Sequence, residues 1–452
     1  RALRGEFPHT LKSLAQSIHV YIIFLSGCVV LSLGSVLLRV LWFVDKYFFH
    51  WVMMYWSRLV VFSVPHMKNR ILNPYGEDFR KPAILIANHQ SFIDSLAVCM
   101  LYPKVVVFVN SWTWNSPFFG LAIRYADFFY IGQGVEYSRE KLEPLVRKGY
   151  SIVIFPEGTR SATGKIGRFH KGAFLLSQEM KLDIIPISLV GFNEVMSKTD
   201  GFYLKDGGLT VHIGKRIPYD DPSWGTTFQE RCRSISAFYK RSFAVLQHES
   251  QDTWNPYYRF KLQQTYAYKG TQVERALRRE LRTEYGYGPY HHLIPRNAVI
   301  CELGCGYGFL AHMLAYLARD RQITAVDDRP GHIELASTGF DKDIRLRFVS
   351  CELPRFELPE CDVSILSHPD MSLSPREQAA LTQKCFQRLP EGGILLIRHN
   401  EKSGPCTEPK IGVSVPADEW PQPTQLIPGA TQIIPEEPVH TFTAYRKNPQ
   451  TC

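Results

Sequence analysis

Residues Ala83–Val98 read AILIANHQSFIDSLAV, an apolar run that stops at an asparagine and a histidine. The run predicts a buried strand, and the polar residues after it predict a turn at the strand end. His89 stands in this turn, with Asp94 close behind it. Neutral imidazole is a base at pH 7 and a carboxylate can hold its second nitrogen, so the pair is a candidate general base. Taken alone, the pair also fits a structural histidine.

A second polar motif, FPEGTRS at Phe155–Ser161, follows another apolar run. Gly158 allows the backbone to approach a ligand closely. Arg160 can hold a phosphate or carboxylate through a bidentate pair, and Glu157 can accept a hydrogen bond from a hydroxyl or orient Arg160. The alternative is a turn at a strand end with a surface salt bridge.

Short apolar runs alternate with helical stretches from Pro65 to about Gln247. AILIAN, VVVFVN, SIVIFPEG and IIPISLVG predict buried strands, and SREKLEPLVRKG predicts a helix that ends at Gly149. This alternation predicts an α/β domain.

The order and spacing of these motifs resemble the glycerolipid acyltransferase family that includes the 1-acylglycerol-3-phosphate acyltransferases. Members carry a His-x4-Asp motif, then a Phe-Pro-Glu-Gly-Thr-Arg motif, then an apolar strand with a proline. Here these are His89/Asp94, Phe155–Arg160 and Ile184–Leu189, and the resemblance covers roughly residues 58–216.

The resemblance implies transfer of an acyl chain from acyl-CoA or acyl-carrier protein to a lysophospholipid or related lipid hydroxyl. It makes His89 the general base and Asp94 its orienting partner, as in a serine hydrolase triad whose nucleophile is the substrate's own hydroxyl. Asn88 and the amides that open the next helix are candidates for binding the oxyanion. Four residues of the second motif are assigned to substrate binding: Glu157, Gly158, Thr159 and Arg160.

One motif departs from the family pattern. Members usually carry an aromatic pair followed closely by an arginine that helps to bind the acceptor phosphate, but the matching stretch YADFFYIGQG, Tyr125–Gly134, has no arginine. Arg124 just upstream is one candidate substitute, and Lys165, Arg168 and Lys171 are others. Otherwise the acceptor is an aminolipid or another hydroxylated lipid.

The N-terminal region predicts contact with a membrane. Val20–Leu38 has no charged residue, and a helix of this length rises about 28 Å, close to the hydrocarbon thickness of a bilayer. We predict a retained span, with a signal peptide as the alternative. Leu41–Phe62 mixes charges with many aromatic residues and predicts a helix in the headgroup interface. The basic residues after the span place the downstream domains in the cytoplasm.

A second constellation begins at Ala298–Ala315, AVICELGCGYGFLAHMLA, which predicts a strand, a glycine-rich turn and a helix. Gly304, Gly306 and Gly308 allow the tight turn. The stretch ITAVDD ends a second strand at Asp327, whose carboxylate can accept hydrogen bonds from the two hydroxyls of a ribose. A nicotinamide-binding domain is the alternative.

Glu302 before the glycines and the later turn LPEGGILLI favour a methyltransferase. Residues 271–445 resemble the class I S-adenosylmethionine-dependent methyltransferases, which have a Rossmann-like fold. The resemblance implies S-adenosylmethionine as cofactor, with Glu302 and the three glycines along its methionine and ribose part and Asp327 at the ribose. The segment SHPDMSLS departs from the usual pattern near the acceptor, so a degenerate domain is the alternative.

Three further stretches of the second half carry predictions. QDTWNPYYRF near residue 251 predicts a linker, and Arg275–Arg282 a charged helix. Lys402–Pro438 is rich in proline and predicts a loop, followed by VHTFTAYR as a last strand.

The composition limits the classes of partner. The chain has 452 residues, a net charge of +9 and 45% hydrophobic residues, which excludes a disordered chain and favours anionic lipids or acidic substrates. It carries no nucleic-acid-binding motif, so nucleic acid is not an expected partner. Its ten cysteines form no CxxC and no zinc spacing, so no metal site is expected, and reduced thiols fit the cytoplasm.

We therefore predict three segments: a membrane span with an interfacial helix (1–64), an acyltransferase domain (65–250) and a methyltransferase-like domain (251–452). This order resembles the C-terminal part of large bacterial proteins that begin with an MMPL-type exporter, and the start at Arg1 fits a piece of a longer protein. The resemblance implies an exporter module as partner and the bacterial inner membrane as location, with the catalytic domains on its cytoplasmic side. The alternative function is a non-catalytic lipid-binding or scaffold module of a lipid export complex.

Overall fold

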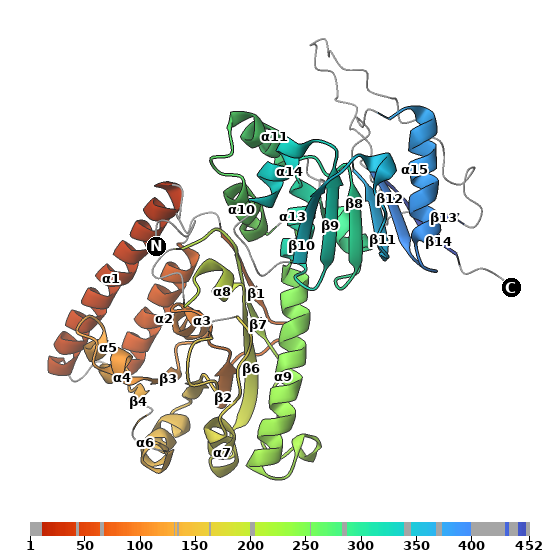
Figure 1. Cartoon of the computed structure of the whole chain (residues 1–452). Coiled ribbons are helices and arrows are strands. Elements are labelled where there is room, and N and C mark those ends of the chain that lie inside the picture. The colour runs from red at the N-terminus through yellow and green to blue at the C-terminus, as the bar shows by residue number, and fades with distance from the viewer. Residues whose placement is uncertain are drawn as a thin grey trace. The chain divides into compact units, whose positions relative to one another are not determined.

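The computed structural model describes residues 11–41, 45–63, 67–130, 132, 135–161, 164–198, 204–253, 255–282, 287–338, 345–367, 373–398, 430–433 and 442–448. The chain divides into two compact units, Arg1–Ser250 and Gln251–Cys452 (Figure 1). Each unit has its own β-sheet; among the described residues the first unit has one hydrophobic core and the second has two. Both are α/β folds, as the alternating sequence pattern predicts.

The first unit is built on a seven-stranded sheet in the order β1-β7-β6-β2-β5-β3-β4. All neighbouring pairs are parallel except β6 with β7. The strands are β1 (Lys68–Leu72), β2 (Ala83–Ala87), β3 (Val105–Val109), β4 (Phe129–Tyr130), β5 (Ser151–Ile154), β6 (Asp183–Val190) and β7 (Gly208–Ile213). Every residue of β2, β5 and β6 is buried, which explains their continuous apolar runs. The four predicted strands are confirmed.

Helices cover both faces of this sheet, and Figure 1 shows α9 on the side opposite α1 and α2. The predicted helix over SREKLEPLVRKG is confirmed as α6, which ends at Arg147. The helices of the unit are α1 (Leu11–Val40), α2 (Lys46–Phe62), α3 (Asp94–Cys99), α4 (Ser111–Trp114), α5 (Gly120–Tyr125), α6 (Val135–Arg147), α7 (Gly172–Glu179), α8 (Phe192–Val195) and α9 (Phe228–Ser250).

Helix α1 is longer than the predicted span and packs on the unit along its length. Near its start the Ser17 hydroxyl accepts the Leu204 N–H at 3.0 Å, and further along the Ser32 hydroxyl donates to the Phe118 carbonyl at 2.7 Å. Within the described residues it is the one helix apolar and long enough to cross a membrane, and 33% of its most apolar window is buried. Its outer face is exposed and apolar, with Ile18, Ile22, Leu25, Val29, Leu33 and Leu37.

Helix α2 carries apolar or aromatic side chains on both its buried and its exposed face. The side chain of its N-cap, Asp45, accepts the Tyr47 N–H. The inner face buries Phe49, Met53, Ser57 and Val60, among others, and the outer face exposes Tyr47, Phe48, Trp51, Tyr55, Leu59 and Phe62. The predicted helix is therefore confirmed from Lys46 onward, while residues 42–44 lie outside the described part.

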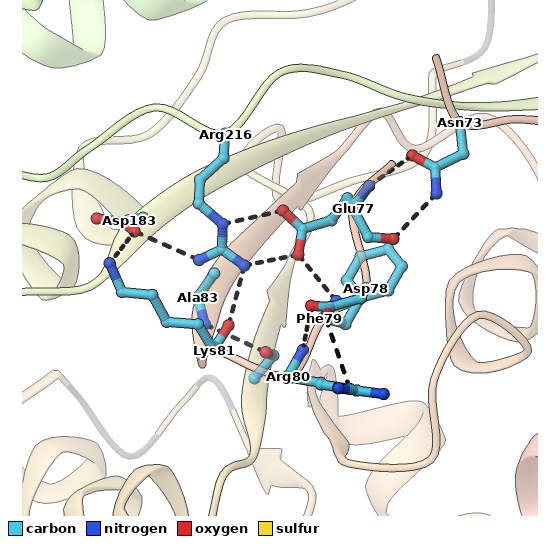
Figure 2. Close-up of polar contacts among 10 residues, drawn as sticks. Asn73, Glu77, Asp78, Phe79, Arg80, Lys81, Ala83, Asp183 and Arg216 are labelled. Atoms are coloured by element: carbon cyan, nitrogen blue, oxygen red, sulfur yellow. Dashed lines mark hydrogen bonds and ion pairs between the residues drawn. The ribbon is translucent and has the colours of Figure 1, made fainter. Parts of the chain in front are cut away.

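A charged cluster fastens the loops at the amino ends of β2 and β6 (Figure 2). The Arg216 guanidinium donates to both carboxylate oxygens of Glu77, at 2.7 and 2.9 Å, and to Asp183 at 3.3 Å. Lys81 donates to Asp183 at 2.7 Å. Burial alone would raise the pKa of Asp183, but these cations and the Tyr219 N–H outweigh it and hold the pKa below its usual value. The cluster is structural, because it lies at the sheet edge opposite His89.

The second unit has a seven-stranded sheet in the order β10-β9-β8-β11-β12-β14-β13, with β14 antiparallel to both of its neighbours. The strands are β8 (Val299–Leu303), β9 (Gln322–Asp327), β10 (Arg345–Ser350), β11 (Val363–Leu366), β12 (Ile394–Arg398), β13 (Ala430–Ile433) and β14 (Phe442–Lys447). Alternate residues of the central strands belong to two separate cores, as expected for a sheet covered on both faces. The predicted last strand is confirmed as β14.

The helices of the second unit are α10 (Pro256–Thr265), α11 (Thr271–Arg282), α12 (Gly288–Leu293), α13 (Phe309–Leu317), α14 (Pro330–Ser337) and α15 (Pro375–Arg388). Side chains of α10 to α14 join one core, and α15 contributes to the other. Two predictions were wrong in part. The predicted linker contains α10, because Asn255 caps a helix that buries Tyr258 and Leu262. The predicted loop over Lys402–Pro438 contains β13, which pairs with β14; residues 402–429 and 434–438 of this stretch lie outside the described part.

Candidate active sites

The two motifs of the first unit meet because β2 and β5 are adjacent parallel strands. Ile86 of β2 is in register with Ile154 of β5, so both strands end at the same edge of the sheet. His89 follows the end of β2, and the FPEGTRS motif follows the end of β5. The Ser161 N–H donates to the His89 carbonyl at 2.8 Å, which joins the two turns directly.

His89 and Asp94 form a hydrogen-bonded pair. His89 Nδ1 lies 2.9 Å from Asp94 Oδ2, and Asp94 is fully buried at the start of α3. The same Oδ2 accepts the N–H groups of Gln90 and Ser91, at 2.5 and 2.7 Å. A carboxylate with these donors is held as an acceptor, so Nδ1 carries the proton and Nε2 is left as the basic nitrogen. The imidazole also stacks on Phe155, with ring centroids 4.5 Å apart.

Glu157 braces the two turns. Its carboxylate oxygens accept the His89 N–H at 2.9 Å and the Gly167 N–H at 2.6 Å, and the residue is 7% exposed. Burial raises the pKa of Glu157, while the two backbone hydrogen bonds act in the opposite direction. Because both oxygens bind the chain's own backbone, the geometry fits a positioning role better than direct contact with a substrate.

The other three residues of the second motif differ in setting. Gly158 has φ +71°, and a Cβ there would approach the His170 ring to 3.3 Å, so the turn requires glycine. Thr159 is exposed. Arg160 is half-buried and lines a cavity beside His89. Of the three, Arg160 is therefore the one placed to contact a ligand in that cavity.

The candidate substitutes for the missing arginine fall into two groups. Arg124 donates to the Trp114 carbonyl at 2.9 Å and lies over the Trp114 ring, so its guanidinium is already bound to α4. Lys165, Arg168 and Lys171 are exposed on the segment that Gly167 ties to Glu157. The downstream cations therefore lie at the surface, whereas Arg124 is engaged with Trp114.

Asn88 does not face the cavity. Its side-chain amide donates to the Leu189 carbonyl at 2.9 Å and accepts the Leu189 N–H at 2.7 Å, and the residue is fully buried. The suggestion that it binds an oxyanion is therefore wrong, because both ends of the amide link β2 to β6. The Tyr239 hydroxyl of α9 accepts the Asn88 N–H at 2.9 Å and donates to the Ile187 carbonyl at 2.6 Å.

Tyr239 was missed by the sequence reasoning. It lies about 150 residues after His89, and no local pattern marks a buried tyrosine as the support of a distant strand end. Its place in the amphipathic helix α9 was the only available signal, and that signal indicates burial alone.

An apolar cavity of about 170 Å³ opens beside His89. Phe155 and Arg160 line it after the end of β5, and Phe24 and Cys28 of α1 also line it. The remaining lining is largely aromatic or aliphatic: Met53, Trp56, Ser57, Phe92, Ser95, Leu96, Cys99, Phe108, Val109, Asn110, Trp112, Thr113, Phe119, Ile123 and Phe128. Such a cavity suits a hydrocarbon chain placed next to a base.

The glycine-rich turn of the second unit follows β8. Gly304, Gly306 and Gly308 have φ values of +73°, +56° and +73°, a region that side chains other than glycine rarely adopt. A Cβ at Gly308 would come within 2.5 Å of the Phe348 ring, so this glycine also serves helix packing. The turn delivers the chain into α13.

Glu302, the penultimate residue of β8, keeps one carboxylate oxygen without a partner among the described residues. Oε1 accepts the Ser367 hydroxyl at 2.6 Å, whereas Oε2 is buried and unpaired. Burial raises the pKa of Glu302 to about 7, against the lowering effect of the Ser367 hydrogen bond. An orphaned buried acceptor of this kind fits a cationic donor from a ligand. Most of SHPDMSLS, at residues 368–372, lies outside the described part.

Asp327 ends β9 next to the glycine-rich turn. Its Oδ2 accepts the Gly306 N–H at 2.7 Å, which confirms that the strand end and the turn meet. The Arg329 side chain also donates to both carboxylate oxygens, at 2.9 and 3.2 Å. Burial acts to raise the pKa of Asp327, but these donors outweigh it and the pKa is lowered.

The comparisons with known proteins agree with this division. Residues 66–190 match the acyltransferase family, and residues 300–393 match the family described as methyltransferase domain. The chain therefore carries an acyltransferase domain and a methyltransferase domain, both of enzyme families.

Individual relatives cover parts of the chain. A chloroplastic 1-acyl-sn-glycerol-3-phosphate acyltransferase of Brassica napus is 28% identical over 183 residues, or 38% of this chain and 52% of that protein. The crystal structure of the acyltransferase PlsC from Thermotoga maritima aligns with a TM-score of 0.45 at 19% identity, over 52% of this chain and 97% of that one. Human N-acetylserotonin methyltransferase, solved with S-adenosylmethionine, aligns with a TM-score of 0.25 at 20% identity, over 30% and 40%. The chain spans about half the length of the curated relatives it matches.

The described residues fit S-adenosylmethionine in two respects. The unpaired Oε2 of Glu302 can accept a hydrogen bond from the cofactor's ammonium group, and Asp327 presents a carboxylate of the kind that binds a ribose diol. The sequence reasoning missed Arg329, whose side chain is hydrogen-bonded to Asp327, although it stands only two positions away.

Proposed function

We propose that the first domain transfers an acyl chain from acyl-CoA or acyl-carrier protein to the hydroxyl of a lysophospholipid or related lipid. The observation that supports this most is the His89–Asp94 pair, which leaves Nε2 of His89 as a base beside an apolar cavity. The matched acyltransferase family supports the reaction class.

The chemistry follows from the site. His89 Nε2 takes the proton of the acceptor hydroxyl as its oxygen attacks the thioester carbonyl, and Asp94 stabilises the imidazolium that forms. Collapse of the tetrahedral intermediate breaks the carbon–sulfur bond and expels the thiolate, which takes the proton back from His89. The cavity would hold the acyl chain, and Arg160 with the downstream cations would hold the acceptor's anionic headgroup.

The test is acyl transfer by the purified chain in lipid vesicles, using labelled acyl-CoA and a lysophospholipid. We expect His89→Ala to lose activity by about three orders of magnitude, whereas His248→Ala, at an exposed histidine of the same unit, should match the wild type. Wild-type activity in His89→Ala would rule out the general base. An inactive wild type that still binds vesicles would favour the non-catalytic scaffold instead.

We further propose that α1 and α2 attach the chain to a membrane. Their outer faces expose apolar and aromatic side chains side by side, and their inner faces help to form the cavity. This arrangement would bring the cavity to the lipid that carries the acceptor. The predicted location, with the domains on the cytoplasmic side of a bacterial inner membrane, and an exporter module as partner remain part of this proposal.

We propose that the second domain binds S-adenosylmethionine through Glu302, the turn with Gly304, Gly306 and Gly308, and Asp327. The matched methyltransferase family supports this cofactor. When bound, the cofactor supplies an electrophilic methyl group. The chain's own part is to bind the ammonium at Glu302 and the ribose near Asp327. Calorimetry with S-adenosylmethionine tests the assignment: Asp327→Ala should weaken binding, and equal binding by both proteins would refute it.

A further inference from the structure

Arg329 occupies the carboxylate that the proposed cofactor needs. Asp327 is 1% exposed, and its two oxygens receive four donors. Two are backbone groups, the N–H of Gly306 on Oδ2 and the N–H of Arg329 on Oδ1. The other two are Nε and Nη2 of the Arg329 side chain, one on each oxygen. An ionised carboxylate has about four lone-pair positions, so the described donors fill them.

The Arg329 side chain imitates a ribose diol. Two parallel N–H donors from one planar group, each aimed at one carboxylate oxygen, make a bidentate pair. A vicinal diol would present two O–H donors to the same two oxygens. The backbone donors cannot leave without unfolding the turn, so the guanidinium is the group that a diol has to displace.

The local sequence explains why Arg329 adopts this position. Pro330 follows it at the start of α14, and a residue before proline is restricted to extended backbone. Arg329 accordingly has φ −101° and ψ 104°. Because Arg329 is extended and lies two positions after Asp327, its side chain folds back over the end of β9.

Arg329 also has a second position within reach. Its side chain is 48% exposed, so it can leave Asp327 without vacating a core. The Asp328 carboxylate, 34% exposed, lies 3.7 Å from Arg329 Nε and can receive the released guanidinium. Two neighbouring acidic groups with one arginine therefore form a switch with a closed and an open position.

We propose that Arg329 is an intramolecular competitor of the cofactor ribose, so that the second domain binds S-adenosylmethionine only in the fraction of molecules in which Arg329 has left Asp327. This inference rests on the cofactor assigned under Proposed function. The apparent affinity is then the intrinsic affinity multiplied by the open fraction. A half-exposed bidentate pair that keeps the site mostly closed reduces affinity by about fivefold.

The experiment measures binding of S-adenosylhomocysteine to the full chain by calorimetry. This ligand is a net-neutral zwitterion, so salt acts mainly on the protein. Arg329→Ala should tighten binding by about fivefold, and Arg329→Lys, which keeps the charge but loses the fork, should tighten it less. Arg319→Ala, at an exposed arginine of the same unit, is the control with the same charge change and should leave binding unaltered.

Two further measurements separate competition from other effects. Raising sodium chloride should tighten binding to the wild type, because salt screens the Arg329–Asp327 pair, and should have no such effect on Arg329→Ala. In an Asp327→Asn background the gain from Arg329→Ala should vanish.

The outcomes discriminate between the two proposals. Equal or weaker binding by Arg329→Ala, with binding by the wild type, would overturn the competition and leave the cofactor site standing. Absence of binding by the wild type and by both Arg329 variants, with unchanged thermal denaturation, would overturn the cofactor site and the competition together.

Discussion

Two buried aspartates show how similar carboxylate settings have different consequences. Asp94 and Asp327 both lie near the carboxyl ends of parallel strands, and both accept backbone N–H groups from a nearby turn. The remaining donor differs. At Asp94 it is a histidine, whose other nitrogen then serves as a base, whereas at Asp327 it is an arginine, which has no lone pair to offer. The side chain that donates to the carboxylate thus decides whether the carboxylate activates a neighbour or is itself blocked.

The largest expected effect tests the first half of this comparison. Asp94→Asn should reduce acyl transfer by about three orders of magnitude, because a neutral amide cannot stabilise the imidazolium. Initial rates with a labelled acyl thioester measure it. Asp220→Asn, at an exposed aspartate of the same unit, is the control. A loss smaller than about tenfold would mean that Asp94 supports only the fold of the turn.

The next effect concerns the apolar cavity of the first site. Cys99 lines it and is 4% exposed, so Cys99→Leu should shorten the space for an acyl chain. We expect kcat/KM for palmitoyl-CoA to fall at least about tenfold relative to octanoyl-CoA. Cys232→Leu changes a buried cysteine elsewhere in the unit and should not alter this ratio. An unchanged ratio in Cys99→Leu would place the acyl chain elsewhere.

A smaller effect tests the second site through the pH dependence of cofactor binding. The pKa of Glu302 is about 7, so its carboxylate is mostly protonated at pH 6 and mostly ionised at pH 8. A cationic ammonium binds the ionised form, and we expect S-adenosylmethionine to bind up to about tenfold more tightly at the higher pH. Calorimetry across this range measures the change. Glu302→Gln should bind weakly and with little pH dependence. Wild-type binding that does not depend on pH would mean that the ammonium does not bind this carboxylate.

The smallest effect concerns Tyr239, which is distant in the sequence from the strand end that it supports. Tyr239→Phe leaves the Asn88 N–H and the Ile187 carbonyl without their partner in a buried setting, so we expect the free energy of unfolding to fall by about 1–2 kcal/mol. Urea denaturation of the variant against wild type measures it. Tyr75→Phe, at an exposed tyrosine, should have no effect. Equal stability of Tyr239→Phe would mean that the strand end before His89 needs no such anchor.

The sequence predicted the parts of the fold that depend on local pattern. Continuous apolar runs marked the central strands, and the polar residues at their ends marked the turns at both sites. It did not predict α10 or β13. A short aromatic helix and an edge strand carry weak periodicity. Helix α10 is stabilised by packing against the distant α13, and β13 by pairing with the next strand, β14, at the edge of the sheet.

By itself, the sequence determined that His89 and Asp94 share one turn, and that Glu302 and Asp327 lie at the ends of two successive strands with three glycines between them, because each relation spans a short segment. The tertiary structure decided what those residues face. It packs α1 within the first unit so that Cys28 lines the cavity, and it engages the Asn88 side chain in hydrogen bonds with β6. It also placed Arg329 over Asp327. Burial and hydrogen-bond partners depend on which surfaces meet in space, and a linear pattern does not record that.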